Sequence, residues 1–222
     1  MDKSDLTFDH VGLWCSDLEA SARRFAAMMH VEVEAGGRHQ GQGTWNRLVG
    51  AVNGVYLELI ARDPEQETAG PMVQAVGAQA DLTSCLAAYR TSDLEGVYAR
   101  AMKLGATSRG VQTMSRAGGD GTTISWRLLF LQHPDHPVLP FFIDWQSTPH
   151  PSSRLKPALS IGSPVFQSPD PDGLEQLLAG LGVRAQIVHG ERPEIIASVR
   201  NGTVSASASG TRSLSTNGTE PE

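Results

Sequence analysis

An internal repeat constrains the fold of this chain more than any other feature of its sequence. The tetrapeptide Ser-Asp-Leu-Glu occurs twice, starting at Ser16 and at Ser92, a spacing of 76 residues. Each copy follows an apolar run typical of a strand and opens a segment with the apolar periodicity of an amphipathic helix. In the first copy, Ser16 and Glu19 have the spacing of a helix capping box. A repeated order of elements indicates a repeated structural unit, so the sequence predicts two copies of one module.

Each module continues from its helix into further strands. In the first copy the two strand-like runs are joined by Asn53 and Gly54, a dipeptide that is a strong hairpin signal. The second copy has two similar runs around a turn. A third, incomplete copy follows a connection rich in proline and serine, with a strand, a helix and two short apolar runs. The strand-like runs of the second copy cover residues 122–132 and 139–146. The first strand and the helix of the third copy lie within residues 158–182.

These segments predict an α+β fold built from tandem βαβββ modules. The two modules, roughly 5–65 and 80–148, are expected to form cupped mixed sheets within a domain of residues 1–150. A partial third βαββ unit over residues 151–204 is expected to pack on that domain. The tail, residues 205–222, is rich in Ser, Thr and Gly and nearly free of large apolar side chains. Such a composition predicts disorder.

Composition and charge disfavour several classes of function. The net charge is −6 and no long basic run is present, so nucleic acid is not expected as a partner. No apolar stretch approaches the roughly 20 residues that a membrane span needs. The first residues carry acidic side chains and no apolar signal-peptide core, and two cysteines are too few for a disulfide scaffold. We therefore expect a cytoplasmic protein that binds a small molecule.

Several strings resemble the glyoxalase-like domain family of the vicinal oxygen chelate (glyoxalase/bleomycin resistance/dioxygenase) superfamily. They include DHVGLWCSDLE, GGRHQGQGTWNRLV, and FFIDW followed by HPS, and the resemblance extends over roughly residues 6–199. The resemblance implies two cupped sheets that face each other around a ligand, and often a homodimer. In metal-dependent members, the first and last strands of each module hold a divalent ion that acts as a Lewis acid.

The first module retains candidate metal ligands, His10 on its first strand and Glu58 on its last. Imidazole and carboxylate suit Zn, Fe, Mn, Ni or Co, and the same two groups form a proton-transfer pair without metal. In the second module, Leu86 stands where His10 stands in the first, and leucine binds no metal. Asp144 lies near the position of Glu58, although a slip of one residue would turn it to the other face. A metal centre and a metal-free cavity both stay open.

The glycine-rich segment between the first helix and the next strand is not a phosphate-binding loop. No Gly-Lys-Ser/Thr follows it, and strands rather than a helix come next. We expect a loop at the mouth of the cavity, from which His39 acts as a catalytic residue or third ligand and Arg38 binds a substrate carboxylate. Pairing of Glu58 with Arg47, or of Arg127 with Asp144, would instead be structural. Further candidates for substrate binding are Arg47, Trp126, Arg127, Asp144 and Trp145.

The sequence favours an enzyme of the glyoxalase-like type, a lyase or isomerase that acts on a small oxygenated molecule. His10, Glu58 and His39 are the expected catalytic residues, with His10 and Glu58 as metal ligands where a metal is bound. One alternative is a non-catalytic small-molecule binding or resistance protein of the same fold. Another is a ring-cleaving dioxygenase, for which His39 would have to replace the histidine missing from the second module.

Overall fold

The computed structural model describes residues 6–67, 70, 73, 80–117 and 123–216. The first module contains β1 (Thr7–Trp14), α1 (Leu18–Met29), β2 (Glu34–His39), β3 (Thr44–Ala51) and β4 (Tyr56–Arg62). The second contains β5 (Thr83–Arg90), α3 (Leu94–Lys103), β6 (Gln112–Ala117), β7 (Thr123–Leu129) and β8 (Phe141–Asp144). The predicted α+β fold with tandem βαβββ modules is confirmed.

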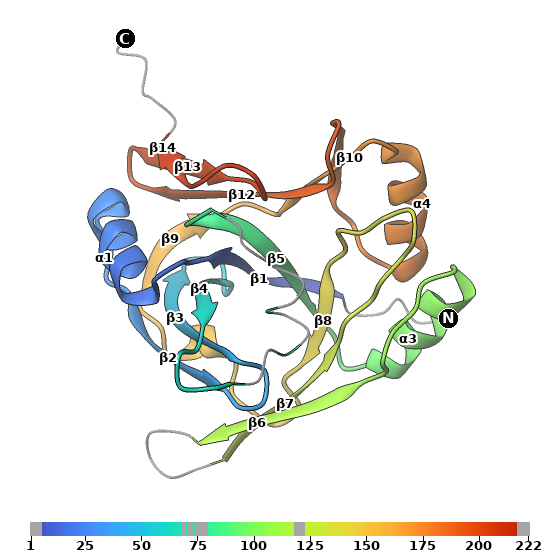
Figure 1. Cartoon of the computed structure of the whole chain (residues 1–222), viewed down its shortest axis with the longest axis horizontal. Coiled ribbons are helices and arrows are strands. Elements are labelled where there is room, and N and C mark those ends of the chain that lie inside the picture. Colours follow the sequence, from blue (N-terminus) through green and yellow to red (C-terminus); the bar gives the residue numbers. More distant parts are fainter. Residues whose placement is uncertain (1–5, 68–69, 71–72, 74–79, 118–122, 217–222) are drawn as a thin grey trace.

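The two modules share one strand arrangement and form a continuous curved sheet (Figure 1). In each module the first strand pairs in parallel with the last, β1 with β4 and β5 with β8. The strands β1 and β5 pair with each other in antiparallel fashion and join the modules at the centre. The helices α1 and α3 lie on opposite sides of the molecule, outside the curve of the sheet (Figure 1). The inner surface of the curve is therefore not covered by α1 or α3.

The first helix begins one residue later than the capping box predicts. Asp17, not Ser16, is the N-cap, and its side chain accepts a hydrogen bond from the backbone N–H of Ala20. The predicted apolar face is confirmed, because Leu18, Ala22, Phe25 and Met29 are buried. In the second module Asp93 caps α3 in the same way. The aspartate of each Ser-Asp-Leu-Glu repeat therefore performs the capping.

A third unit extends the sheet beyond β3. It contains a 3₁₀ turn (Pro151–Ser153), β9 (Pro157–Ile161), β10 (Val165–Ser168), α4 (Pro171–Leu181), β11 (Gln186–His189), β12 (Glu194–Asn201), β13 (Val204–Ala208) and β14 (Ser215–Thr216). Strand β9 pairs in parallel with β3 and connects this unit to the first module. Its strand order differs from that of the modules, because β10 and β11 are direct neighbours.

The prediction of disorder from residue 205 onward is wrong for residues 205–216. Strand β13 pairs with β12, and Ala206, Ala208 and Leu214 are buried in the core beside α1. Composition predicted disorder because the segment has few large apolar side chains. A strand that joins an existing sheet gains backbone hydrogen bonds, and small alanines suffice where it packs closely. Residues 217–222 lie outside the described residues.

Apolar side chains pack on both surfaces of the sheet. One core lies under α1 and extends to the third unit, and a second lies under α3 and α4. A third cluster lies on the inner surface, and its buried members include Trp14, Ile60, Leu86, Trp126 and Phe141. In the part of the chain that the structure describes, no helix combines the length and the apolar character needed to cross a membrane.

Candidate functional site

A cavity opens on the inner surface of the sheet. Its polar lining comes from the first module and the loop after β2, namely His10, His39, Gln42, Thr44, Asn46, Tyr56 and Glu58. Its opposite wall, from β6 to the 3₁₀ turn, is apolar and aromatic: Met114, Trp126, Leu128, Phe130, Phe141, Ile143, Trp145 and Pro151. The cavity therefore has one polar side and one apolar, aromatic side.

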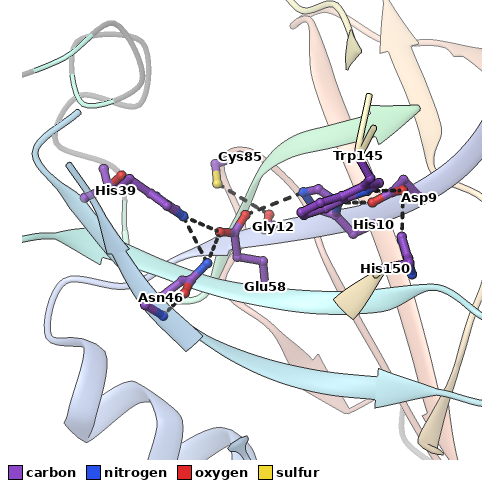
Figure 2. Close-up of polar contacts among 11 residues, drawn as sticks. Asp9, His10, Gly12, His39, Asn46, Glu58, Cys85, Trp145 and His150 are labelled. Atoms are coloured by element: carbon purple, nitrogen blue, oxygen red, sulfur yellow. Dashed lines mark hydrogen bonds and ion pairs between the residues drawn. The ribbon is translucent and has the colours of Figure 1, made fainter. Parts of the chain in front are cut away.

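Glu58 lies between the two histidines on the polar side (Figure 2). Its side chain is 7% exposed, and the Asn46 amide donates a hydrogen bond of 2.5 Å to Oε1. The other oxygen, Oε2, lies 3.6 Å from Nε2 of His10, and Oε1 lies 3.7 Å from Nε2 of His39. The carboxylate is therefore held at one oxygen and faces His10 with the other.

A backbone group of the glycine-rich segment sets the orientation of Asn46. The N–H of Gly37 donates to Oδ1 of Asn46 at 2.7 Å, so the amide nitrogen must point toward Glu58. Strand β2 contains a bulge between Ala35 and Arg38, which places two glycines opposite Asn46. The segment expected to be a loop is thus a bulged strand as far as His39, and it orients an active-site amide.

His10 is held by the residue that precedes it. Neighbouring residues of a regular strand point to opposite faces, but β1 has an irregularity between Phe8 and His10 in its pairing with β5. The bulge lets Asp9 lie beside His10, with Oδ1 2.6 Å from Nδ1 of the imidazole (Figure 2). The His10 ring stacks on Tyr56, with 4.4 Å between ring centroids. Together these contacts direct Nε2 toward Glu58.

Asp9 is fully buried and receives two further hydrogen bonds. Nε2 of His150 lies 2.9 Å and Nε1 of Trp145 lies 3.1 Å from Oδ2. His150 accepts the backbone N–H of Ser152 at Nδ1, so its proton is on Nε2. Burial by itself would raise the pKa of Asp9, but the hydrogen bonds from His10 and His150 outweigh it and hold that pKa well below the usual range. Asp9 is ionised, and as an ionised carboxylate it only accepts hydrogen bonds, so His10 donates from Nδ1.

Five residues named from the sequence line the cavity: His10, His39, Glu58, Trp126 and Trp145. His39 lies at the end of β2, and its Nδ1 is 2.8 Å from the Thr44 hydroxyl. Its ring meets the edge of Trp126, with 6.3 Å between centroids, so it reaches across to the apolar wall. The structure brings together the residues proposed for chemistry and the two tryptophans proposed for binding.

Four other residues named from the sequence lie outside the cavity lining and pair with other side chains instead. Arg38 pairs with Asp63 and Glu65, and Arg47 pairs with Glu19 rather than with Glu58. Arg127 pairs with Asp144 at 2.7 Å and with Glu95 of α3 at 2.5 Å. Strand alternation explains these positions, because Asn46, Trp126 and Ile143 face the cavity and their neighbours face the helices.

Asp144 is also not the counterpart of Glu58. Glu58 is the partner of Gly12 in the parallel pairing of β1 with β4. The repeat spacing relates Gly12 to Ala88, whose partner on β8 is Phe141. The second module therefore presents Leu86 and Phe141 where the first presents His10 and Glu58.

Sequence reasoning missed Asp9 and Tyr56 as site residues and gave Asn46 no site role, and for His150 it favoured packing in a turn over a catalytic role. No sequence pattern indicated a role for Asp9, because in a regular strand its side chain would point to the face opposite that of His10. Asn46 is detectable in principle, since it lies two residues from both Thr44 and Leu48 on a strand whose alternate residues face the cavity. His150 is brought to Asp9 by the chain that follows β8, a contact across 141 residues of sequence.

Comparison with known proteins identifies the family of this chain. A family described as Glyoxalase-like domain matches residues 8–182. This chain belongs to the glyoxalase-like domain family. Among solved structures, a hypothetical protein from Staphylococcus aureus shares 19% identity and a TM-score of 0.64, over 85% of this chain and 88% of that one. That likeness shows the fold.

Two methylmalonyl-CoA epimerases resemble the chain more distantly. The Streptomyces coelicolor enzyme, in a complex with 2-nitronate-propionyl-CoA, shares 23% identity and a TM-score of 0.46, over 64% of this chain and 100% of its own. The Mycobacterium tuberculosis enzyme shares 20% identity and a TM-score of 0.47, over 66% of this chain and 93% of its own. A search among curated proteins finds no match.

The side chains of this glyoxalase-like domain do not fit a metal centre with ligands from both modules. Leu86 and Phe141 occupy the two positions in the second module, and neither has a donor atom. Within residues 6–67, 80–117 and 123–216, no three His, Cys, Asp or Glu side chains are grouped to hold a metal ion. We derive no chemical step through a metal.

The glyoxalase-like site depends on the absence of a side chain at Gly36. A Cβ atom there would collide with Oδ1 of Asn46 and lie 2.5 Å from its backbone oxygen. We expect Gly36→Ala to lower the free energy of unfolding in urea by about 1–3 kcal/mol, because the overpacked strand must shift. Gly162→Ala is the control, since its nearest contact would be 3.9 Å away. Equal stability of the two variants would contradict the role assigned to Gly36.

Proposed function

We propose that this chain is an enzyme that moves a proton at a carbon next to a carbonyl group of a small molecule, as an isomerase or lyase, without a metal. The observation that carries the proposal is the position of Glu58. Its carboxylate is nearly buried, is held by Asn46 at Oε1, and faces both His10 and an apolar cavity with Oε2. A buried carboxylate without a cationic partner such as Arg or Lys is costly, and a catalytic role accounts for that cost.

Glu58 serves as the base in this proposal. Because Asn46 occupies Oε1, the oxygen that receives the proton is Oε2. The apolar wall opposite excludes water, and a poorly hydrated carboxylate removes a proton from carbon more readily. The C–H bond breaks and its electron pair forms the C=C bond of an enol, while Glu58 takes up the proton.

His10 serves as the acid for the substrate oxygen. Its Nδ1–H is donated to Asp9, so Nε2 is the ring atom that faces a substrate. In its protonated form Nε2 gives a proton to the carbonyl oxygen as the C–H bond breaks, so that no free enolate forms. In an isomerisation of a 2-hydroxycarbonyl compound, Glu58 gives its proton to the former carbonyl carbon, while the neighbouring hydroxyl returns a proton to Nε2 of His10 and becomes the new carbonyl group. In a lyase reaction the enol O–H instead returns its proton to His10 as the carbonyl re-forms, and a leaving group on the next carbon departs with the proton from Glu58.

A second candidate is a binding protein without turnover. The observation that favours it is the wholly apolar second-module wall, in which Leu86 and Phe141 replace polar groups. Such a protein would bind the same molecules and leave their C–H bonds intact.

Hydrogen–deuterium exchange separates these two functions. Neutral carbonyl compounds, among them 2-hydroxyacetophenone, are incubated with the protein in D₂O, and loss of the α-proton signal is followed by NMR. We expect exchange well above the buffer rate, unchanged after the protein is treated with EDTA. Exchange that requires an added divalent ion would refute the metal-free mechanism. Binding without exchange for every compound would establish the binding protein instead.

A further inference from the structure

The charge of the cavity indicates what kind of molecule it accepts. Among the lining side chains that the structure describes, none is lysine or arginine. The arginines nearest in sequence to lining residues, Arg38, Arg47 and Arg127, are paired with carboxylates outside the cavity. The charge that the lining does carry is the carboxylate of Glu58, beside two histidines. A bound carboxylate or phosphate would therefore meet a like charge and no permanent cation.

The aromatic rings of the apolar wall indicate which ligand shape the cavity accepts. Trp126 and Trp145 lie with 5.9 Å between ring centroids, and Phe130 stacks on Phe141 at 5.1 Å. Phe141 also meets the edge of the His10 ring at 5.6 Å, so the aromatic wall continues to the reactive group. Aromatic rings bind flat apolar molecules by offset stacking and edge contacts.

From these observations, and resting on the function proposed above, we propose that the substrate is a neutral, flat, largely apolar molecule with one carbonyl-type group. Its ring lies against Trp126, Trp145 and Phe141, and its carbonyl group lies between His10 and Glu58. Anionic molecules of the same shape are rejected, because transfer of an anion from water to a site beside Glu58 is not compensated by an arginine or a lysine.

Calorimetric titration with two probes of similar shape tests this proposal. The probes are 2-acetylnaphthalene, which is a neutral ketone, and 2-naphthoate, which is an anion. We expect the wild-type protein to bind the ketone at least about 100-fold more tightly, the scale expected when like charges are brought together in a binding site. Tighter or equal binding of the naphthoate, or no binding of the ketone, would overturn the proposal.

Two variants test the physical cause of the selection. Glu58→Gln removes the negative charge and should reduce the preference for the ketone by about 10-fold or more. Met114→Lys adds a cation on the opposite wall and should increase naphthoate binding, whereas Val52→Lys, on the exposed turn after β3, should not. An unchanged preference in Glu58→Gln would show that charge does not select the ligand.

The binding experiment and the exchange experiment test the two proposals separately. If the ketone binds selectively but no compound exchanges its α-proton, the proposed function is wrong and the ligand class stands. If exchange is observed but naphthoate binds as well as the ketone, the reaction stands and the ligand class is wrong.

Discussion

Replacement of Glu58 by glutamine should reduce the rate of α-proton exchange by about 10²–10⁴-fold, the usual contribution of a general base. Glutamine keeps the shape of glutamate, and its side-chain oxygen still accepts the hydrogen bond from Asn46. The loss would therefore report the missing base rather than a misfolded site. The rate is measured by NMR in D₂O at saturating ligand, with the unfolding transition in urea recorded for the same sample.

Asp144→Asn is the matched control for this experiment. Asp144 is also a buried carboxylate on a strand, but it faces Arg127 and α3 rather than the cavity. We expect its exchange rate to stay near that of the wild type, although the protein becomes less stable. If Asp144→Asn and Glu58→Gln lose the same activity, then Glu58 has no special chemical role and the proposed function is wrong.

The second large effect concerns Asp9. Asp9→Asn should lower the free energy of unfolding by about 3 kcal/mol, the scale for removing one partner from a buried charged network. Three N–H donors, from His10, His150 and Trp145, converge on its carboxylate. An amide offers one oxygen acceptor and turns an N–H donor toward the others. Urea unfolding at neutral pH measures the change, and Asp135→Asn, at an exposed turn, should leave stability unaltered.

The Asp9 contribution also predicts a pH dependence. Because the folded-state pKa of Asp9 is lowered, the unfolded chain takes up a proton at this residue below about pH 4 while the folded chain stays ionised. The stabilisation is therefore complete above that pH and declines as the pH falls toward the folded-state pKa. The difference between wild type and Asp9→Asn should shrink between about pH 5 and about pH 3. A difference that grows on acidification would contradict the assigned network.

The repeat was sufficient to predict the tandem modules, because identical capping segments recur at a fixed spacing. The resemblance to the glyoxalase-like family singled out His10 and Glu58, on the first and last strands of the first module, and both residues line one cavity. Trp126 and Arg127 were both predicted as substrate-binding residues, although strand alternation could have excluded one of them from the sequence alone. Trp126 and Arg127 are adjacent on one strand, so both could not face the cavity.

Features that depend on irregular backbone could not be predicted from the sequence. The bulge that turns Asp9 toward His10, and the bulge that places Gly37 against Asn46, follow from pairing between strands and leave no local pattern. The contact of His150 with Asp9 depends on the path of the chain after β8. Residues 205–216 are ordered because β13 pairs with the edge of β12, and amino-acid composition contains no information about that edge.

The polar and apolar sides of the cavity come from different modules, and this division affects which substitutions can alter ligand selection alone. In the proposed function, the groups that handle protons come from the first module, and most of the apolar surface that contacts the ligand comes from the second. Substitutions at Met114, Leu128 or Ile143 can therefore alter which molecule is accepted while the reactive groups keep their mutual geometry. A second module that lacks polar groups at these two positions therefore offers a surface on which selectivity can be engineered while the polar side of the first module stays unchanged.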